Sequence, residues 1–435
     1  MCDPSKRYLL ILALFALLMA MMPVQIIPGE DGWEPESVIT WSPGDGPIVI
    51  DESIEIDETT RLVIEAGVEV RLDEGKGIQV KGHLLVQGTA QEPVLFTAND
   101  TSVPLGPDSW ESIRLLSESA GRTHLVEHAM FQGARTGLLV SSTEALVQDC
   151  TFTLNRYGLV ARGGAMVEVR SSDFINNSAL GLEWEEGSGG LAVDCYFEDN
   201  VVGVYFYRSS TPQVVNCEFS ANYHHASFAN GSDGTIRSCT FRGAIAEAYE
   251  CYDASSPLLV DVTIENQDDD GIHIRNDSRP RMVGGTPVSN MVVDSKDNGS
   301  YVIAMAWITV EVRGDDGKRL EEANVTVRGA SGSLFTRGMT DGEGVLMNVL
   351  MSTYTVGLQG GHDLENPHTV VVEWRGHNQT FRVDPRDLNN DWVLVLEMDI
   401  DPPEPGGWGF VNKVVLIMLI SVTAIVVAWW VLRKK

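Results

Sequence analysis

The residues most able to do chemistry lie close together late in the chain, where the sequence contains Asp268, Asp269, Asp270, His273 and Arg275. Carboxylate oxygens are the ligands that Ca²⁺ prefers, and a carboxylate beside a histidine can supply an acid and a base. The group therefore suggests a calcium site or a catalytic site. A solvated acidic turn is the simpler interpretation, because all five residues belong to one short stretch of chain.

A second set of residues mixes aromatic rings, carboxylates and basic groups at alternating positions. Alternate residues of a strand share a face, so these side chains are expected to project outward together. Rings stack on sugars and acids accept hydrogen bonds from sugar hydroxyls, so the pattern predicts a glycan-binding strip. Exposed strand residues of high β-propensity would give the same pattern without any ligand. The strip consists of Glu183, Glu185, Tyr205, Tyr207, Glu250, Tyr252, His273 and Arg275.

The sequence contains a repeat whose length is about that of one coil of a β-solenoid. This repeat predicts the strands that carry these side chains. Aromatic residues recur at intervals of 21, 22, 23, 22 and 22, and an isoleucine continues the series 23 residues later. The chain shows no 3.6-residue periodicity in this region, which argues against a helical solenoid. The repeated positions, all expected to face inward, are Phe131, Phe152, Phe174, Phe197, Phe219, Phe241 and Ile264.

Three further positions recur with the aromatic ladder. Residues two places earlier should also face inward; they are Ala129, Cys150, Ser172, Cys195, Cys217, Cys239 and Val262. Asparagines three places later predict a turn, since Asn tolerates left-handed backbone and bonds to nearby main chain; they are Asn155, Asn177, Asn200 and Asn222. Glycines then open a second short strand, at Gly137, Gly158, Gly181, Gly203 and Gly271.

The repeated cysteines raise the question of disulfides. An oxidising compartment would permit them. In-register neighbours, however, hold their Cβ atoms about 4.8 Å apart, beyond the usual disulfide range of about 3.5 to 4.5 Å. We therefore expect a ladder of buried thiols, with Cys251 on another face.

On these residues the chain resembles the right-handed parallel β-helix proteins, the pectin-lyase-like group, in their repeat-rich surface-protein form. The resemblance covers residues 38–303, and its opening coils are matched by Leu62–Val70, Ile78–Val86, Glu92–Phe96 and Trp110–Ile113. Lyases and hydrolases of this fold assemble carboxylates and a basic residue across adjacent coils, and no such constellation can be traced in the sequence. Solenoid ends need covering, and the segment Trp33–Trp41 is expected to cover the first coil.

A different β pattern begins after the repeat, over residues 304–400. Alternating segments predict a small β-sandwich with strands at Ile308–Val312, Asn324–Val327, Val345–Val349 and Tyr354–Leu358. The pattern resembles the carboxypeptidase-regulatory-like, immunoglobulin-like modules of surface proteins. That resemblance implies a spacer or adhesive module without catalysis.

The two ends of the chain predict export and membrane attachment. Residues 1–27 combine Lys6 and Arg7 with an apolar run, as in a signal peptide or an uncleaved signal anchor. Residues 401–410 form a linker, and residues 411–435 contain 19 uncharged residues followed by a basic tail, which predicts a transmembrane helix with a cytoplasmic C-terminus. A C-terminal sorting signal that is cut and replaced by a lipid would show the same features.

The charge balance excludes one class of partner. Between the hydrophobic ends lie 25 basic and 60 acidic residues, so the surface repels nucleic acid. An excess of Asn-Xaa-Ser/Thr sequons suggests glycosylation of an exposed ectodomain. The seven sequons are at Asn99, Asn176, Asn230, Asn276, Asn298, Asn324 and Asn378.

Taken together, these features predict a mainly β fold: a right-handed parallel β-helix, a small β-sandwich and a C-terminal transmembrane helix. The expected function is noncatalytic binding or adhesion to glycans or cell-surface proteins. The alternatives are a polysaccharide-active lyase or hydrolase, or an envelope maturation factor. No cofactor is expected, unless the acidic turn binds calcium.

Overall fold

The computed structural model describes residues 33–117, 122–265, 271–284, 291–293, 299–357, 366–388 and 393–399. The chain divides into two compact units, one formed mainly by residues up to Met305 and one mainly by the residues from Ala306 onward. The predicted signal segment, linker and transmembrane segment lie outside the described residues. Within the described residues, no helix has both the length and the apolar character needed to cross a bilayer.

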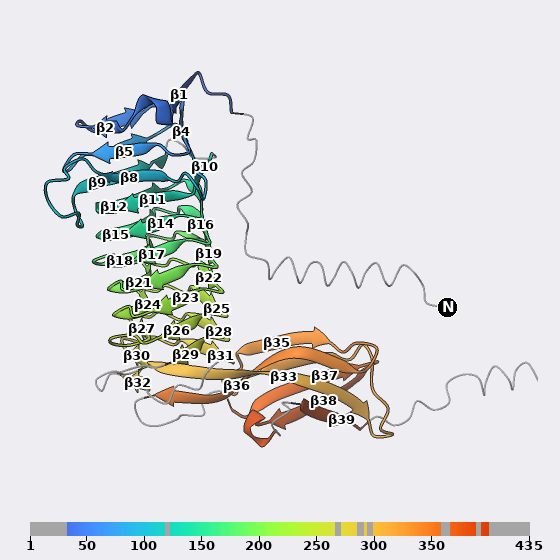
Figure 1. Cartoon of the computed structure of the whole chain (residues 1–435). Coiled ribbons are helices and arrows are strands. Elements are labelled where there is room, and N and C mark those ends of the chain that lie inside the picture. Colours follow the sequence, from blue (N-terminus) through green and yellow to red (C-terminus); the bar gives the residue numbers. More distant parts are fainter. Residues whose placement is uncertain are drawn as a thin grey trace, which may run out of the picture. The chain divides into compact units, whose positions relative to one another are not determined.

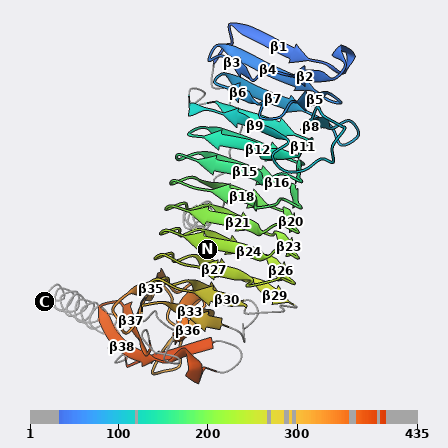
Figure 2. The ribbon, with the colours of Figure 1, turned by 90° about the vertical axis from the view of Figure 1, so that its left-hand side faces the viewer.

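The first unit is a solenoid whose strands stack in parallel into three sheets (Figures 1 and 2). Sheet A runs in the order β1 (Ser37–Trp41), β4 (Thr60–Glu65), β7 (His83–Gln87), β10 (Thr123–Glu127), β13 (Glu144–Gln148), β16 (Met166–Arg170), β19 (Gly189–Val193), β22 (Gln213–Val215), β25 (Thr235–Arg237), β28 (Leu258–Val260), β31 (Arg281–Val283) and the start of β33 (Tyr301–Gly314). A short 3-10 turn, η1 (Pro43–Asp45), follows β1.

The other two sheets of the solenoid have the same parallel order. Sheet B contains β2 (Ile48–Ile50), β5 (Glu69–Leu72), β8 (Val94–Ala98), β11 (Ala129–Gln132), β14 (Thr151–Thr153), β17 (Asp173–Ile175), β20 (Tyr196–Glu198), β23 (Glu218–Ser220), β26 (Thr240–Arg242) and β29 (Thr263–Glu265). Sheet C contains β3 (Ile54–Ile56), β6 (Ile78–Val80), β9 (Trp110–Leu115), β12 (Ala134–Ser141), β15 (Tyr157–Arg162), β18 (Leu180–Trp184), β21 (Val202–Tyr207), β24 (His224–Ala229), β27 (Tyr249–Cys251), β30 (Ile272–Ile274) and β32 (Met291–Val293). The predicted right-handed β-helix is confirmed.

The repeated phenylalanines form the centre of sheet B. Each of the first five pairs in register with the phenylalanine of the next coil, Phe241 pairs with Ile264, and all six phenylalanines are fully buried. From Phe131 to Phe219 the rings lie parallel, with centroids 4.6 to 4.9 Å apart, and Phe96 extends the stack by one coil. The stack ends at Phe241, whose ring is turned by 77° from that of Phe219. The predicted inward face is therefore correct.

The cysteines form a ladder of thiols, as expected. Cys150, Cys195, Cys217, Cys239 and Cys251 are all buried and free. The backbone N–H of Cys195 donates to the sulfur of Cys217, whose own N–H donates to the sulfur of Cys239. Burial raises the pKa of the Cys150 thiol to about 12.

The asparagine ladder bonds between coils, but its backbone differs from the prediction. The amide of Asn155 donates to the Phe131 carbonyl at 3.0 Å and to the side-chain oxygen of Asn177 at 3.1 Å. The left-handed residue is in each case the one before the ladder asparagine: Leu154, Asn176, Asp199 and Ala221. The turn thus bends at the preceding residue, because the ladder asparagine must point its amide into the solenoid.

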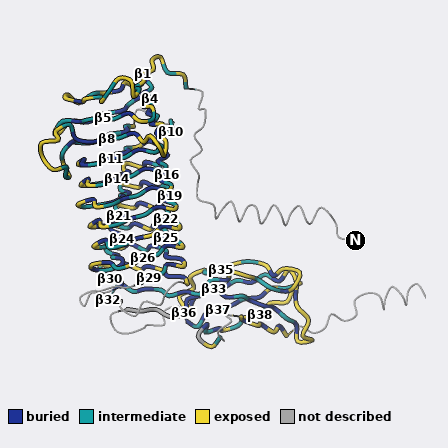
Figure 3. The backbone as a smooth tube through the Cα atoms, in the orientation of Figure 1, coloured by how far each residue is buried: buried dark blue, intermediate teal, exposed yellow. Residues whose placement is uncertain are grey.

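The segment at the first coil also differs from the expectation. Residues Ser37–Trp41 do not lie over the first coil as a separate cover; they are its first strand, β1, paired in parallel with β4. Val38 and Ile39 are 55% and 41% exposed, and Figure 3 shows this strand mostly in the colour of exposed residues. Trp33 packs edge-on against His83, with Arg122 over its ring at 4.3 Å.

The second unit consists of β-strands around a separate core. An antiparallel sheet has the order β35 (Leu334–Met339), β34 (Asn324–Arg328), β37 (His368–Trp374) and β38 (His377–Val383), while β39 (Val393–Met398) pairs in parallel with β33 and β36 (Val345–Gly357) lies next to β33. A short 3-10 turn, η3 (Pro385–Asp387), follows β38. Alternate residues such as Val325 and Val327 are buried in the core.

One strand boundary in this unit was predicted wrongly. The expected strand Val345–Val349 and the residues Tyr354–Gly357 of the next expected strand belong to a single strand, β36. Leu358, the last residue of that expected strand, lies outside the described residues. No glycine or proline separates them, and the intervening Leu350–Thr353 are residues that a strand accommodates. The immunoglobulin-like resemblance of this module stays a prediction.

Candidate functional site

The predicted strip lies on the outer side of sheet C. Glu183, Tyr205, Ser227, Glu250 and His273 pair in register on successive strands from β18 to β30. All except Ser227 are partly exposed, and the residues that alternate with them, Trp184, Phe206, Cys251 and Ile274, are buried. The expected outward direction is therefore correct, and a binding role for the strip stays a prediction.

The tyrosines of the strip contact one another and nearby arginines. The hydroxyls of Tyr205 and Tyr252 lie 3.0 Å apart, and the rings of Tyr205 and Tyr207 stack with centroids 5.5 Å apart. Arg208 lies 4.9 Å from the centroid of Tyr207, and Arg275 lies 4.8 Å from that of Tyr252. The two arginines therefore stack on tyrosine rings that the sequence analysis had predicted to stack on sugars. Tyr205 has no such arginine over its ring within the described residues.

A groove of about 590 Å³ opens on the same face, toward the first half of the solenoid. Five consecutive strands of sheet C, from β9 to β21, contribute to it. Its lining residues are Glu111, Arg114, Arg135, Thr136, Leu139, Tyr157, Val160, Arg162, Leu180, Glu183, Glu185 and Tyr205. Acidic and basic groups from adjacent coils are thus brought together, which the sequence analysis failed to detect.

The charged groups of the groove are partly paired. Glu111 lies 2.5 Å from a guanidinium nitrogen of Arg114 and 3.7 Å from one of Arg135. Glu183 has no ion pair among the described residues; burial and, to a smaller extent, the neighbouring Glu185 raise its pKa to about 7. The pKa of Tyr205 is also raised, first by burial and then by its contact with Tyr252. A carboxyl group that titrates near neutral pH can donate or accept a proton.

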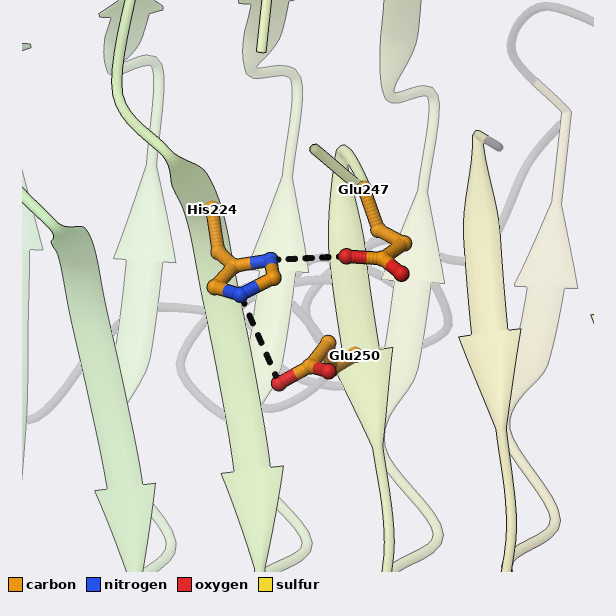
Figure 4. A group of neighbouring side chains, drawn as sticks. All are labelled: His224, Glu247 and Glu250. Atoms are coloured by element: carbon orange, nitrogen blue, oxygen red, sulfur yellow. Dashed lines mark ion pairs between the residues drawn. The ribbon is translucent and has the colours of Figure 1, made fainter. Parts of the chain in front are cut away.

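A second group of side chains gathers further along sheet C. His224, Glu247 and Glu250 offer ligand atoms within 4.8 Å of one another, and no other group in the described part of the chain meets this criterion for a metal (Figure 4). His273, which the sequence analysis did select, lies beside both carboxylates. His224 and Glu247 were missed, because neither occupies the alternating positions that defined the strip.

The other predicted sites are placed only in part. Asp268, Asp269, Asp270 and Asn298 lie outside the described residues. Arg275 follows β30, and its guanidinium group lies over the ring of Tyr252. The remaining sequon asparagines are all at least partly exposed: Asn99, Asn176, Asn230, Asn276, Asn324 and Asn378.

A comparison with protein-family models agrees with the solenoid. Residues 136–290 match the family model described as "Right handed beta helix region". Similar solved structures include the periplasmic alginate epimerase AlgG, with 14% identity, a TM-score of 0.48, and coverage of 62% of this chain and 82% of that chain. The pectate lyase Pel9A has 13% identity, a TM-score of 0.42, and coverage of 62% and 82%. An alginate lyase from Paenibacillus sp. str. FPU-7 has 11% identity, a TM-score of 0.32, and coverage of 58% and 98%.

Identities and TM-scores this low carry no residue's role across. No curated protein sequence matches the chain significantly.

Proposed function

We propose that this chain is a membrane-anchored extracellular β-helix protein that binds glycans in the groove on sheet C. The observation that carries the proposal is the groove itself, which spans five successive strands and mixes arginines, carboxylates and a tyrosine ring. An elongated polar groove suits a chain-like ligand with many hydroxyl groups. The predicted export segment and C-terminal apolar run support the extracellular location.

The charge of the groove favours an acidic glycan. Arg114, Arg135 and Arg162 line it in a protein whose formal net charge is −30. Guanidinium groups bind carboxylates and phosphates in a two-pronged geometry, and a tyrosine ring stacks on the apolar face of a sugar. A sugar acid would therefore find both kinds of contact in this groove.

Binding of the purified full-length chain to an array of acidic and neutral glycans tests the proposal. Tyr205→Ala and Arg162→Ala should each weaken binding of an acidic glycan by about tenfold, which corresponds to about 1.4 kcal/mol. Tyr196→Ala is the matched control, since Tyr196 is a partly exposed strand tyrosine on sheet B. Unchanged affinity in both groove variants, or no binding across the array, would refute the proposal.

A second candidate, a polysaccharide-active enzyme, is favoured by one observation, the raised pKa of Glu183 inside the same groove. A protonated carboxyl group could protonate a leaving oxygen, and its carboxylate form could remove a proton from a sugar. Incubation with acidic polysaccharides should then release unsaturated or reducing sugar products, and Glu183→Gln should abolish their release. Glycan binding without product would reject catalysis and leave the binding proposal intact.

A further inference from the structure

Two histidines and two glutamates from three consecutive coils form a ring of alternating bases and acids. His224 begins β24, Glu247 and Glu250 belong to the next coil, and His273 is on β30. His224 Nδ1 lies 3.1 Å from a carboxylate oxygen of Glu247, and its Nε2 lies 3.8 Å from one of Glu250. His273 Nδ1 lies 3.5 Å from the other oxygen of Glu247 and 4.0 Å from the other oxygen of Glu250.

The backbone explains why the four side chains meet. Ala226 pairs with Tyr249, so His224 is level with Glu247 one coil later. A bend at Ala248, before β27 begins, lets Glu247 and Glu250 reach the same outer side although they are three residues apart. The bend is held by the Ala248 carbonyl, which accepts hydrogen bonds from the backbone N–H groups of two residues of β24.

The histidine that begins β24 is held in a fixed orientation. The ring of Tyr223 stands edge-on to that of His224, at 4.7 Å between centroids. The Nδ1 atom of His224 is buried and makes no hydrogen bond within the described residues, although a Glu247 oxygen is 3.1 Å away. With the proton on Nε2, the lone pair of Nδ1 would face this carboxylate, and a cation between the two would bridge them.

We propose that His224, Glu247 and Glu250 bind a divalent transition metal ion of the Zn²⁺ type, with His273 positioning the two carboxylates. Ligand atoms about 2.0 to 2.2 Å from Zn²⁺ in a tetrahedral arrangement are about 3.3 to 3.6 Å apart. One ligand atom from each of His224, Glu247 and Glu250 lies within 4.8 Å of the other two, so small side-chain movements would bring the three to this spacing. The side chains are 13% to 25% exposed, so an ion can enter from solvent.

The ligand set selects the kind of metal. An imidazole nitrogen with two carboxylates suits Zn²⁺ and its neighbours in the first transition row, whereas Ca²⁺ takes six to eight oxygen ligands. The proposal is independent of glycan binding, since none of its residues lines the groove. In the absence of a metal the same four residues would form only a histidine–carboxylate network.

The test uses the full-length chain without a polyhistidine tag, stripped of metal with a chelator. Titration with Zn²⁺ by calorimetry, and with Co²⁺ by visible absorption, should show one equivalent bound with nitrogen and oxygen ligation. His224→Gln and Glu250→Gln should each weaken Zn²⁺ binding by at least about 100-fold, and His273→Ala by about 10- to 100-fold. Excess Ca²⁺ should not displace Co²⁺.

A matched control is His128→Ala, because His128 also faces a carboxylate, Asp149 at 3.8 Å, elsewhere on the solenoid. It should bind Zn²⁺ as the wild type does, and circular dichroism of all metal-free variants should match. Absence of a one-equivalent site, wild-type affinity for Zn²⁺ in both ligand variants, or displacement of Co²⁺ by Ca²⁺ would overturn the proposal.

Discussion

Glu183 occupies an outward strand position where its carboxyl group loses much of its hydration. Burial and then Glu185 raise its pKa from about 4.5 to about 7. Between these two values the folded chain binds more protons at this position than the unfolded chain does. Ionisation of Glu183 therefore destabilises the folded chain relative to the unfolded chain. This destabilisation grows as the pH rises from about 4.5 through about 7.

We expect Glu183→Gln to stabilise the protein above pH 7 by about 2 kcal/mol and to have little effect near pH 4. The amide keeps the shape of the side chain but cannot ionise. Urea unfolding of both proteins across this pH range measures the difference, with Glu198→Gln on sheet B as the control. A constant difference between wild type and Glu183→Gln at all pH values would show that Glu183 does not titrate in this range.

At the scale of elements, the stacked phenylalanines hold the coils together. Phe197 lies between Phe174 at 4.9 Å and Phe219 at 4.6 Å, measured between ring centroids, and is fully buried. A coil has no core of its own, so each ring is buried by the coils on either side. Loss of one ring leaves a cavity that its neighbours cannot close without breaking register.

Phe197→Ala should therefore destabilise the β-helix by about 3 to 5 kcal/mol, as expected for removal of a buried aromatic ring. Val201→Ala is the comparison within the same coil, because Val201 is 45% exposed and should cost less than about 0.5 kcal/mol. Urea denaturation followed by circular dichroism measures both. Similar losses in the two variants would mean that the ring stack does not carry the fold.

These elements also show what could be predicted from the sequence. Phe197 and Cys195 were placed correctly because each inward position recurs in every coil. Glu247 was missed because the bend at Ala248 breaks strand alternation. The groove was missed because it depends on register between coils, and the pairing of β9 with β12 shifts between Thr136 and Leu138. Long-range register of this kind is not visible in local spacing.

At the scale of the whole molecule, the charge distribution and the two chain ends are the main basis for predicting where the protein is located and what it binds. The formal net charge is −30, yet arginines line the groove, so an acidic ligand would meet favourable charges only locally. Residues 1–27 and 411–435 lie outside the described residues, and their membrane roles stay predictions. Orientation is therefore best tested on cells.

Protease added to intact cells should remove the β-helix and leave a small fragment that contains residues 411–435. The reason is that the basic tail, Arg433 to Lys435, is expected to stay in the cytoplasm. Immunoblotting with an antibody to the tail measures the fragment, with permeabilised cells as the control. Protection of the β-helix in intact cells would contradict the orientation, and mass spectrometry of the mature C-terminus would reveal a processed sorting signal.

The coil-to-coil register has a consequence for how proteins of this kind can change in length. Cys195 and Cys217 occupy equivalent positions 22 residues apart, and the backbone N–H of each donates to the cysteine sulfur of the next coil. Duplication or loss of the gene segment for one such interval would join a coil to a neighbour with matching inward residues, asparagines and cysteines. A change of a few residues inside a strand would instead turn its inward side chains outward. Descendants of this sequence should therefore tolerate length changes of whole coils, and smaller insertions should be confined to the turns between strands.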